Sequence, residues 1–331
     1  MRRGLVLGGG GVLGAAWAVG ALRAVEEETG WRPGEAEVIL GTSAGSVLGT
    51  LLAAGVGTAD LTDHQRGLDL AAGPLAGVGF GYEEALGGAL PPLPRPGFGS
   101  PGLLRATVRN PRGYPFLTMV SAAAPTGRAS VAPVGELVRG LVGEAAPGGW
   151  PLRVVSVDYG TGRRVVFGDP GQPPAPVAEA VMASCAIPGW FAPVELDGHR
   201  YVDGGCWSAT NADLMLGRGL DEVYVLAPMA LRPGWPDGRG EVRGPVGAVR
   251  EWRRRDRPRG VLVQLVGRYR RVVTRQLFRE VRALRAAGVR VQVLAPTLED
   301  LAAMGPNMMD PLRRALTLET ALHTTARALR G

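Results

Sequence analysis

The sequence contains no lysine, and its 331 residues include only two cysteines, Cys185 and Cys206. Two cysteines are too few for a disulfide framework or a cysteine-based metal site, so we expect neither. Apolar runs are also short, and none approaches the roughly 18 residues that suggest a membrane-spanning helix. The first residues, MRRGLVLGGGG, lack the apolar segment and cleavage site of a signal peptide. These absences predict a cytoplasmic protein without a signal peptide or transmembrane segment.

Positive charge comes from arginine and is concentrated in one region. The net charge is +7, and Arg250–Arg290 contains 14 arginines against only Glu251, Asp256 and Glu280, a local charge of +11. No zinc pattern, RNP motif or interleaved aromatic residues accompany these arginines, so we expect no nucleic-acid partner. Two interpretations remain open. The region contacts an anionic membrane surface peripherally, or it is the solvated face of a helix whose apolar side is buried.

The order of apolar and small-residue patterns indicates an α/β chain. Residues 4–7 and 37–40 are short apolar runs typical of buried strands, and helical patterns follow them at 12–30 and 44–54. This strand–helix–strand–helix order predicts a parallel sheet covered by helices. Later segments continue it with a hairpin at 152–168, strands at 201–205, 222–228 and 289–296, and helices at 177–186, 261–287 and 311–329.

We expect one domain over residues 1–331 with two insertions. Residues 71–130 are rich in glycine and proline but apolar, which suggests an ordered cap or flap rather than a linker. Residues 232–260 are rich in proline, glycine and arginine, which predicts a mobile loop.

A serine between two glycines follows the second predicted strand. The stretch VILGTSAGSVLG places Gly41, Ser43 and Gly45 directly before a helix, which is the nucleophile-elbow pattern. Small flanking residues permit the sharp turn, and the N-terminus of the next helix directs its N–H groups to the same place. We predict that Ser43 is a nucleophile. The alternative is a tight turn whose glycines serve only packing.

A serine hydroxyl needs a base, and the sequence offers histidine or a carboxylate. His64, His199 and His323 lie in segments that do not mark any of them as a catalytic base. Asp203 ends a predicted strand and precedes two glycines. In open α/β sheets the chemistry gathers at the carboxyl ends of the strands. Asp203 is therefore a candidate base, although an Asp-Gly turn would give the same local sequence.

Four successive glycines, Gly8 to Gly11, connect the first predicted strand to its helix. Their N–H groups can form an anion-binding nest that the helix dipole strengthens. Gly9, Gly11 and Gly14 also satisfy the dinucleotide pattern G-x-G-x-x-G, but the acidic residue expected at the end of the next strand is missing. Nucleotide binding is therefore the less favoured interpretation. An oxyanion hole facing the carbonyl that Ser43 attacks is the favoured one.

In this order, Gly-Gly-Gly-x-x-Gly, Gly-Thr-Ser-Ala-Gly and Asp-Gly-Gly resemble the motifs of the patatin-like phospholipases, and ASCAIPGWFAPVELDGHRYVDGG is similar to the family's segment before its acid. The resemblance covers residues 4–55 and 177–228. It implies a three-layer α/β/α sandwich with a mainly parallel central sheet. It also implies a serine acyl hydrolase that cleaves lipid carboxyl esters, of phospholipids or acylglycerols, through a Ser–Asp dyad and an acyl-enzyme, without a metal or cofactor.

Carried over by position, the resemblance makes Ser43 the nucleophile and Asp203 the base. The oxyanion donors would be the amides of Gly9, Gly10 and Gly11. The glycines that complete the three motifs are Gly8, Gly14, Gly41, Gly45, Gly204 and Gly205. Many family members carry Lys or Arg where this chain has Leu13, so the help of that cation is absent.

Two other functions stay open. A Ser-His-Asp esterase would require one of the three histidines as its base. A non-catalytic lipid-binding protein would keep the fold without the chemistry, and the intact serine, acid and glycines argue against it.

Overall fold

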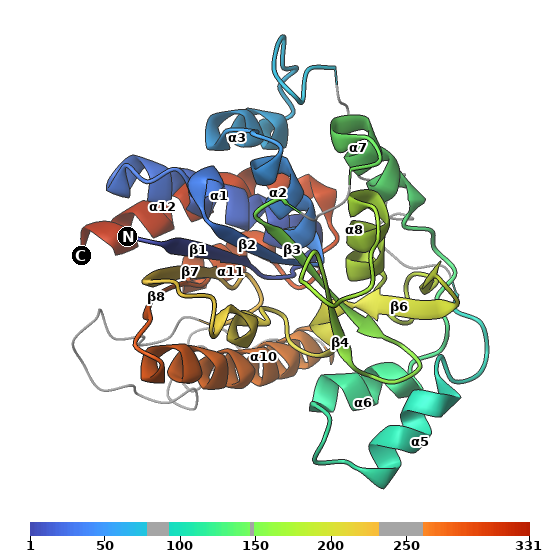
Figure 1. Ribbon diagram of the computed structural model, residues 1–331. Helices are drawn as coiled ribbons and strands as arrows, with labels where there is room; N and C mark the ends of the chain where they lie inside the picture. The colour runs from blue at the N-terminus through green and yellow to red at the C-terminus, as the bar shows by residue number, and fades with distance from the viewer. Residues whose placement is uncertain (78–92, 146–148, 232–260) are drawn as a thin grey trace.

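A mixed sheet of eight strands lies at the centre of the part of the chain that the structure describes (Figure 1). The computed structural model describes residues 1–77, 93–145, 149–231 and 261–331. The strand order is β5-β6-β3-β2-β1-β7-β8, and β4 also pairs with β3. The strands are β1 Arg3–Leu7, β2 Val38–Thr42, β3 Leu152–Asp158, β4 Arg164–Phe167, β5 Val194–Leu196, β6 His199–Asp203, β7 Glu222–Leu226 and β8 Arg290–Leu294.

Five strands of this sheet pair with one another in parallel, and three more join them at one end through antiparallel pairs. β1 pairs in parallel with β2 and β7, β2 with β3, and β7 with β8. β4 and β6 run antiparallel to β3, and β5 runs antiparallel to β6. The prediction of a mainly parallel sheet is confirmed. The antiparallel direction of β6 does not follow from the sequence pattern, and it matters for the site described below.

One helical layer covers the face of the sheet to which Leu5 and Leu7 point, where they pack with Trp17 and Leu22. In this layer α1 and α12 lie against each other (Figure 1). A Cβ at Gly20 would lie 2.5 Å from the carbonyl oxygen of Leu318, so glycine permits this close approach. The layer contains α1 Gly11–Thr29, α2 Ala44–Ala53, α3 Thr58–Arg66, α7 Ala132–Val142, α8 Val177–Cys185, α11 Leu298–Met304 and α12 Arg314–Arg330.

The opposite face of the sheet packs against α10, Val261–Ala286 (Figure 1). Val6 points to this side, alternating with its neighbours as strand geometry requires. Leu277, Val281 and Leu284 of α10 are fully buried there. The α/β/α architecture expected from the sequence is confirmed. The apolar side of α10 is part of the core, as one of the two interpretations of the basic region expected. Residues 250–260 of that region lie outside the described residues.

Two further helices, α5 Pro101–Arg109 and α6 Phe116–Ala123, lie beyond the antiparallel end of the sheet (Figure 1). Thr118 of α6 donates a hydrogen bond to the carbonyl oxygen of Cys206, and the Tyr159 hydroxyl donates one to the carbonyl oxygen of Ser121. These helices belong to the expected flap, of which residues 78–92 lie outside the described residues, as does the expected loop at 232–260. The short 3-10 helices are η1 Pro33–Glu35, η2 Gly204–Cys206, η3 Ala212–Met215 and η4 Pro311–Arg313.

Among the described helices, none is both long enough and apolar enough to cross a membrane.

Candidate active site

Ser43 occupies the sharp turn between β2 and α2. Its backbone has φ 53° and ψ −128°, an unfavourable conformation for a residue with a side chain, and its side chain is almost fully buried. Glycines surround it because the turn leaves no room for a Cβ. At Gly41 a Cβ would lie 2.5 Å from Cα of Ser46, and at Gly45 it would collide with the carbonyl oxygen of Leu7. The geometry is that of a nucleophile elbow.

Strand β3 brings Asp203 to this turn. The last residue of β2, Thr42, pairs with Val155 of β3, and the last residue of β6, Asp203, pairs with the next residue, Ser156. Because β4 occupies the other edge of β3 over these residues, β2 and β6 must share one edge and meet end to end. Their opposite directions turn both carboxyl ends towards the same point. The side chains of Ser43 and Asp203 therefore meet although 160 residues separate them.

Gly204 permits the close contact of the two strand ends. A Cβ at this position would lie 2.5 Å from the carbonyl oxygen of Val155 and 3.2 Å from Cγ2 of Thr42. The amide of the next residue, Gly205, donates a 2.6 Å hydrogen bond to Oδ1 of Asp203. The two glycines after Asp203 therefore act differently. Gly204 allows the backbone to approach Val155 and Thr42 closely, and Gly205 orients the Asp203 carboxylate.

The environment of Asp203 changes the pKa of its carboxyl. Burial raises the pKa of this carboxyl to about 6, although hydrogen bonds from the Ser43 side chain and the Gly205 amide favour its ionised form. A carboxylate with a raised pKa accepts a proton more readily than an exposed one. Asp203 can therefore take a proton from the serine hydroxyl that contacts it.

Ser184 fixes the backbone of the turn and was not predicted. The N–H of Ser43 donates to Oγ of Ser184 at 2.9 Å, and the Ser184 hydroxyl donates to the carbonyl oxygen of Val155 at 2.6 Å. Ser184 thereby connects the elbow to the part of β3 where β2 ends. The only signal in the sequence is a small polar residue at the end of the predicted helix at 177–186.

Asn211 holds the loop that follows Asp203 against β2. Its Nδ2 donates to Oγ1 of Thr42 at 3.1 Å and to the carbonyl oxygens of Gly204 and Ser208 at 3.3 and 2.6 Å. Its φ of 52° lies in the left-handed region, which asparagine tolerates better than most residues. Sequence analysis missed this residue because no local motif marks it.

The glycine run after β1 lies beside Ser43, and its amides differ in their hydrogen bonds. The amides of Gly8 and Gly9 donate to the carbonyl oxygens of Leu226 and Ala209 at 2.9 and 2.8 Å. The expectation that Gly9 is an oxyanion donor is therefore corrected, because its N–H is already engaged. Within the described part of the chain, the amides of Gly10 and Gly11 have no partner. They remain as candidate donors at the N-terminus of α1.

A buried cation, Arg270 of α10, lies behind this glycine run. Its Nη1 donates to the carbonyl oxygen of Pro228 at 2.8 Å, and its Nη2 lies 3.3 Å from the sulfur of Met308. A Cβ at Gly10 would meet the Pro228 ring at 3.0 Å, so Arg270 supports the wall against which the glycines pack. Burial lowers the pKa of Arg270 to about 10, and the group stays charged near neutral pH. In the sequence, Arg270 stands three residues before Val273, an apolar position of the predicted helix. Residues three apart lie on the same face of a helix, so this spacing could have placed Arg270 on the buried side.

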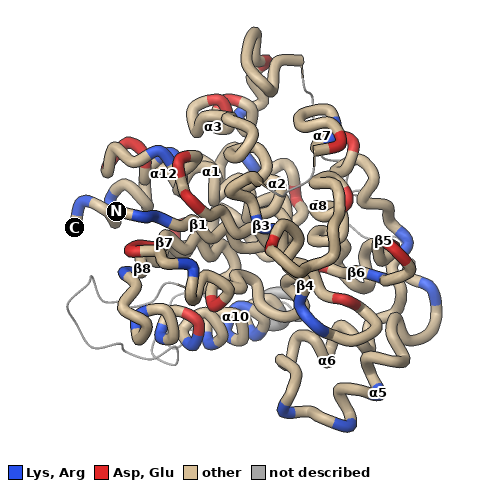
Figure 2. The backbone as a smooth tube through the Cα atoms, in the orientation of Figure 1, with Lys and Arg blue, Asp and Glu red and all other residues tan. Residues whose placement is uncertain are grey.

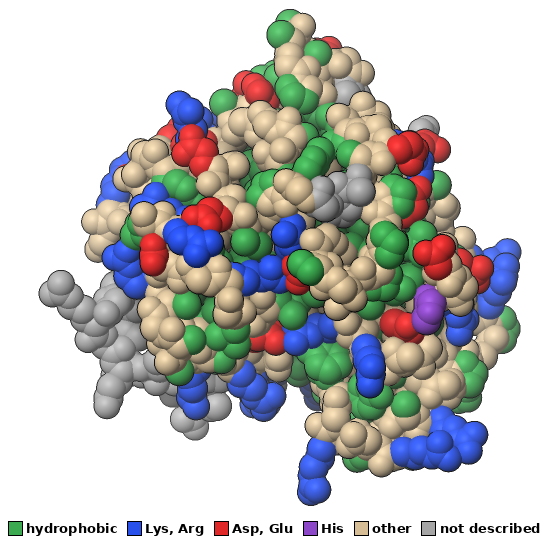
Figure 3. Space-filling model, viewed as in Figure 1, with side chains coloured by type: hydrophobic (Ala, Val, Ile, Leu, Met, Phe, Trp, Pro, Cys, Tyr) green, Lys and Arg blue, Asp and Glu red, His purple; other side chains and the backbone are tan. Residues whose placement is uncertain are grey.

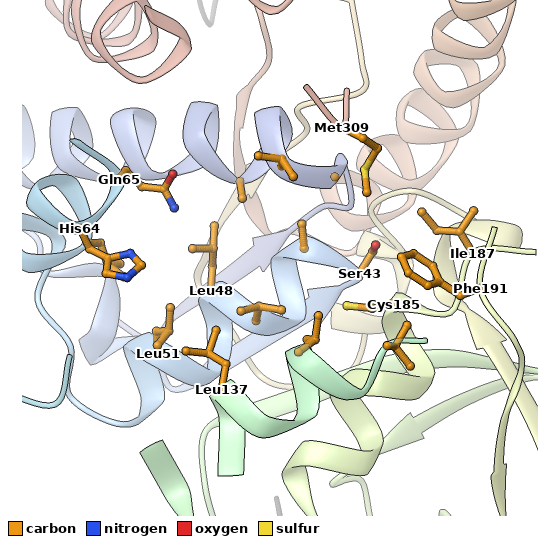
Figure 4. A pocket seen from close by; sticks show the side chains of 18 of the residues that line it. Ser43, Leu48, Leu51, His64, Gln65, Leu137, Cys185, Ile187, Phe191 and Met309 are labelled. Atoms are coloured by element: carbon orange, nitrogen blue, oxygen red, sulfur yellow. The ribbon is translucent and has the colours of Figure 1, made fainter. Parts of the chain in front are cut away.

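Two cavities meet at Ser43. The first is apolar and runs along α2 between α1, α3 and α7, with Ser43 at one end and His64 and Gln65 at the other (Figure 4). The second contains Asp203, the glycine run and residues of α6, and it also reaches Ser43. Apart from His64 and Gln65 at its far end, the first cavity is lined mainly by apolar side chains, and the second contains the Asp203 carboxyl and the glycine run.

None of the three histidines lies beside the Ser43–Asp203 pair. His64 lines the far end of the apolar cavity (Figure 4). His199 is largely exposed, and its Nδ1 lies 2.9 Å from Oδ2 of Asp158. His323 is exposed on α12. Within the described residues, no group of histidine, cysteine or acidic side chains is arranged to hold a metal ion.

Comparisons with known proteins identify the family of this chain. The family model described as patatin-like phospholipase matches residues 5–216 of the chain. No curated protein matches the chain. Among solved structures, the crystal structure of VipD from Legionella pneumophila is similar at 15% sequence identity and a TM-score of 0.43, over 99% of this chain and 67% of that chain. The match to the family model spans well over half of the sequence and includes every motif discussed above, so the chain belongs to the patatin-like phospholipase family.

Proposed function

We propose that this protein is a serine acyl hydrolase that cleaves carboxyl esters of lipids through a Ser43–Asp203 dyad. The observation that carries the proposal is the meeting of the two strand ends on β3, which brings Ser43 and the buried carboxyl of Asp203 to the same point. Family membership supports lipid acyl hydrolysis as the class of reaction.

In the proposed mechanism Ser43 attacks the ester carbonyl while Asp203 takes its proton. The amides of Gly10 and Gly11 stabilise the tetrahedral oxyanion at the positive end of α1. Asp203 then returns the proton to the leaving alcohol, and an acyl-enzyme remains on Ser43. A water molecule, deprotonated by Asp203, hydrolyses that acyl-enzyme and restores the free serine. No step needs a histidine, a metal or a cofactor.

The two cavities suggest how the substrate binds. We assign the acyl chain to the apolar cavity and the alcohol part to the cavity beside Asp203. From Ser43 to Leu51 the apolar cavity follows α2 for eight residues, which is about 12 Å at the rise of an α-helix. An extended chain advances about 1.2 Å per bond, so about ten carbons fit along this length. We also propose that residues 71–130 form a cap, because α6 lines the second cavity.

The direct test is hydrolysis of p-nitrophenyl esters of graded chain length, with Ser43→Ala as the control. We expect kcat/KM to rise with chain length up to about ten carbons, because each buried methylene adds transition-state binding, and then to level off. An absence of hydrolysis for every ester would leave a lipid-binding protein without the chemistry.

The pKa of Asp203 sets the expected pH dependence. Since burial raises this pKa to about 6 and only the ionised form accepts a proton, kcat/KM should fall about tenfold for each pH unit below that value. Above it the rate should stay level until another group titrates. A pH profile measured with a neutral p-nitrophenyl ester checks this. A rate that stays constant well below pH 6 would show that Asp203 is not the base.

The arginines of α10 supply a surface for weak contact with anionic lipid. Basic positions recur along α10 (Figure 2). Arg268, Arg275, Arg279 and Arg282 are exposed and, within the described residues, form no ion pair with a carboxylate. Each arginine near an anionic surface contributes about 1 kcal/mol. We propose that, within Arg250–Arg290, the exposed arginines of α10 contact membranes through charge, because the apolar side of this helix is buried.

This contact predicts a salt-sensitive contribution to vesicle binding. Changing Arg275, Arg279 and Arg282 to glutamine should weaken sedimentation with anionic vesicles at low salt by about a hundredfold. The difference should disappear at high salt, where surface charges are screened. Equal sedimentation of the wild type and the variant at low salt would leave these arginines as a solvated face only.

A further inference from the structure

The lobe formed by α5 and α6 has an unusual concentration of exposed apolar side chains. We refer to the described residues 93–124 as the lobe. Of the eleven large hydrophobic side chains that are exposed in the described residues, five lie in it. They are Leu93, Phe98, Val108, Phe116 and Val120, each more than half exposed. Exposed phenylalanines gathered in one segment are typical of an interaction surface rather than of a solvated one.

Each helix of the lobe separates a buried side from this apolar outer side. In α6 the buried residues are Thr118, Ser121 and Ala122, while Phe116 and Val120, one helical turn apart, face solvent. In α5 Leu103 is fully buried and Val108 is exposed. The inner side is fixed by the hydrogen bonds to Cys206 and Tyr159 given above, whereas no described segment of the chain covers the outer side.

The charge of the lobe has one sign. Its charged residues are Arg95, Arg105, Arg109 and Arg112, and the sequence from 93 to 124 contains no aspartate or glutamate. All four arginines are exposed, and within the described residues none forms an ion pair with a carboxylate. Apolar and arginine side chains lie together on the lobe at the lower right of the molecule (Figure 3).

The lobe is continuous with the candidate active site. Leu117, Val120, Ser121 and Ala124 line the cavity that contains Asp203, and Val120 is at the same time half exposed. A surface in contact with the outer side of α6 would therefore lie at the opening of that cavity. α10 differs in this respect, because Leu277, Val281 and Leu284 lie in the core and its exposed side chains, within the described residues, are arginines and Ala286.

We propose that the outer face of the lobe docks on an anionic lipid surface, with Phe98, Val108 and Phe116 inserted among the lipids and the arginines at the headgroups. Exposed apolar side chains accompanied only by cations match the two layers of such a surface, acyl chains and anionic phosphates. Docking there would present lipid esters to the cavity beside Ser43. The delivery of esters to Ser43 rests on the proposed function, whereas the docking of the lobe on lipid does not require catalysis.

The test compares two matched pairs of substitutions in vesicle sedimentation, with vesicles of phosphatidylcholine containing about one-third phosphatidylglycerol. Phe98→Ser/Phe116→Ser should lower partitioning at least about tenfold, because two inserted phenyl rings are lost. Leu312→Ser/Leu316→Ser, which changes two exposed leucines away from the lobe, should bind as the wild type does. Arg105→Gln/Arg109→Gln should weaken binding to these anionic vesicles by about thirtyfold at low salt and leave binding to pure phosphatidylcholine vesicles unchanged.

Salt separates this docking from the contact through α10. Inserted phenylalanines are not screened, so part of the wild-type binding should survive about 0.5 M salt, and Phe98→Ser/Phe116→Ser should abolish that part. Hydrolysis of water-soluble p-nitrophenyl butyrate should be unchanged in this variant, because neither phenylalanine lines the cavities at Ser43.

Three results would overturn the inference: no vesicle binding by the wild type, wild-type binding by Phe98→Ser/Phe116→Ser, or an equal loss in the leucine control. The Ser43→Ala variant keeps the inference separate from the proposed function, since it should bind vesicles fully without hydrolysing any ester. If the wild type hydrolysed no ester but bound vesicles through the two phenylalanines, the docking would stand and the proposed catalysis would fall.

Discussion

Asp203→Asn is expected to lower kcat for p-nitrophenyl butyrate by about a thousandfold, the usual contribution of a general base. Asparagine has nearly the same shape and can accept the hydrogen bond from the Gly205 amide, but it cannot take the proton of Ser43. Ser43→Ala should reduce the rate to the background, because no acyl-enzyme forms. Steady-state kinetics on both variants, with circular dichroism to show that they fold, measure the effect.

The stability of Asp203→Asn provides an internal check on this result. Burial raises the pKa of Asp203, so between its ordinary pKa and about 6 the folded state binds more protons than the unfolded state. By linkage, the free energy of unfolding falls as the pH rises through this window, and ionised Asp203 costs stability at neutral pH. The neutral asparagine should therefore keep or raise Tm at pH 7. A loss of activity with an equal or higher Tm is a catalytic effect and not unfolding.

Substitutions of the histidines decide between the dyad and a Ser-His-Asp triad. We expect His64→Ala, His199→Ala and His323→Ala to retain turnover of p-nitrophenyl butyrate within a few fold. Near-normal turnover by Asp203→Asn, or loss of turnover in one folded histidine variant, would replace the dyad with the triad.

Gly45→Ala should have the largest effect on stability. A Cβ at this position would collide with the carbonyl oxygen of Leu7 and lie 2.9 Å from that of Gly8, and backbone atoms cannot move aside as a side chain can. Overpacking against rigid neighbours costs about 3 kcal/mol, and here α2 must shift away from the end of β1. The free energy of unfolding, measured by urea titration, should fall by about this amount. Turnover should fall as well, because Ser43 directly precedes α2.

Gly140→Ala is the matched control for this substitution. Gly140 lies inside α7, and a Cβ there would meet no atom within 4 Å. Alanine is a better helix former than glycine by about 1 kcal/mol, so this variant should be as stable as the wild type or more stable. A similar loss of stability in both variants would mean that steric contact at Gly45 is not the cause.

The sequence by itself determined the elements and the chemical groups of this protein, because both depend on short-range patterns. The short runs at 4–7 and 37–40 are typical of buried strands. The small residues around Ser43 and after Asp203 indicate tight turns in the backbone. The four glycines from Gly8 to Gly11 likewise predict a group of backbone N–H donors after a strand. The order of these motifs then indicated the family, and the mainly parallel sheet followed from the alternation of strands and helices.

Tertiary structure alone decided how these groups meet, because strand direction and register depend on pairing between distant segments. No local pattern states that β6 is antiparallel or that Thr42 and Asp203 pair with consecutive residues of β3. The engaged amide of Gly9 depends on Ala209, which is 200 residues away along the chain. The amphipathic pattern of α10 does not say what covers the apolar side of the helix. Only the structure shows that Leu277 lies in the core while arginines of the same helix are exposed.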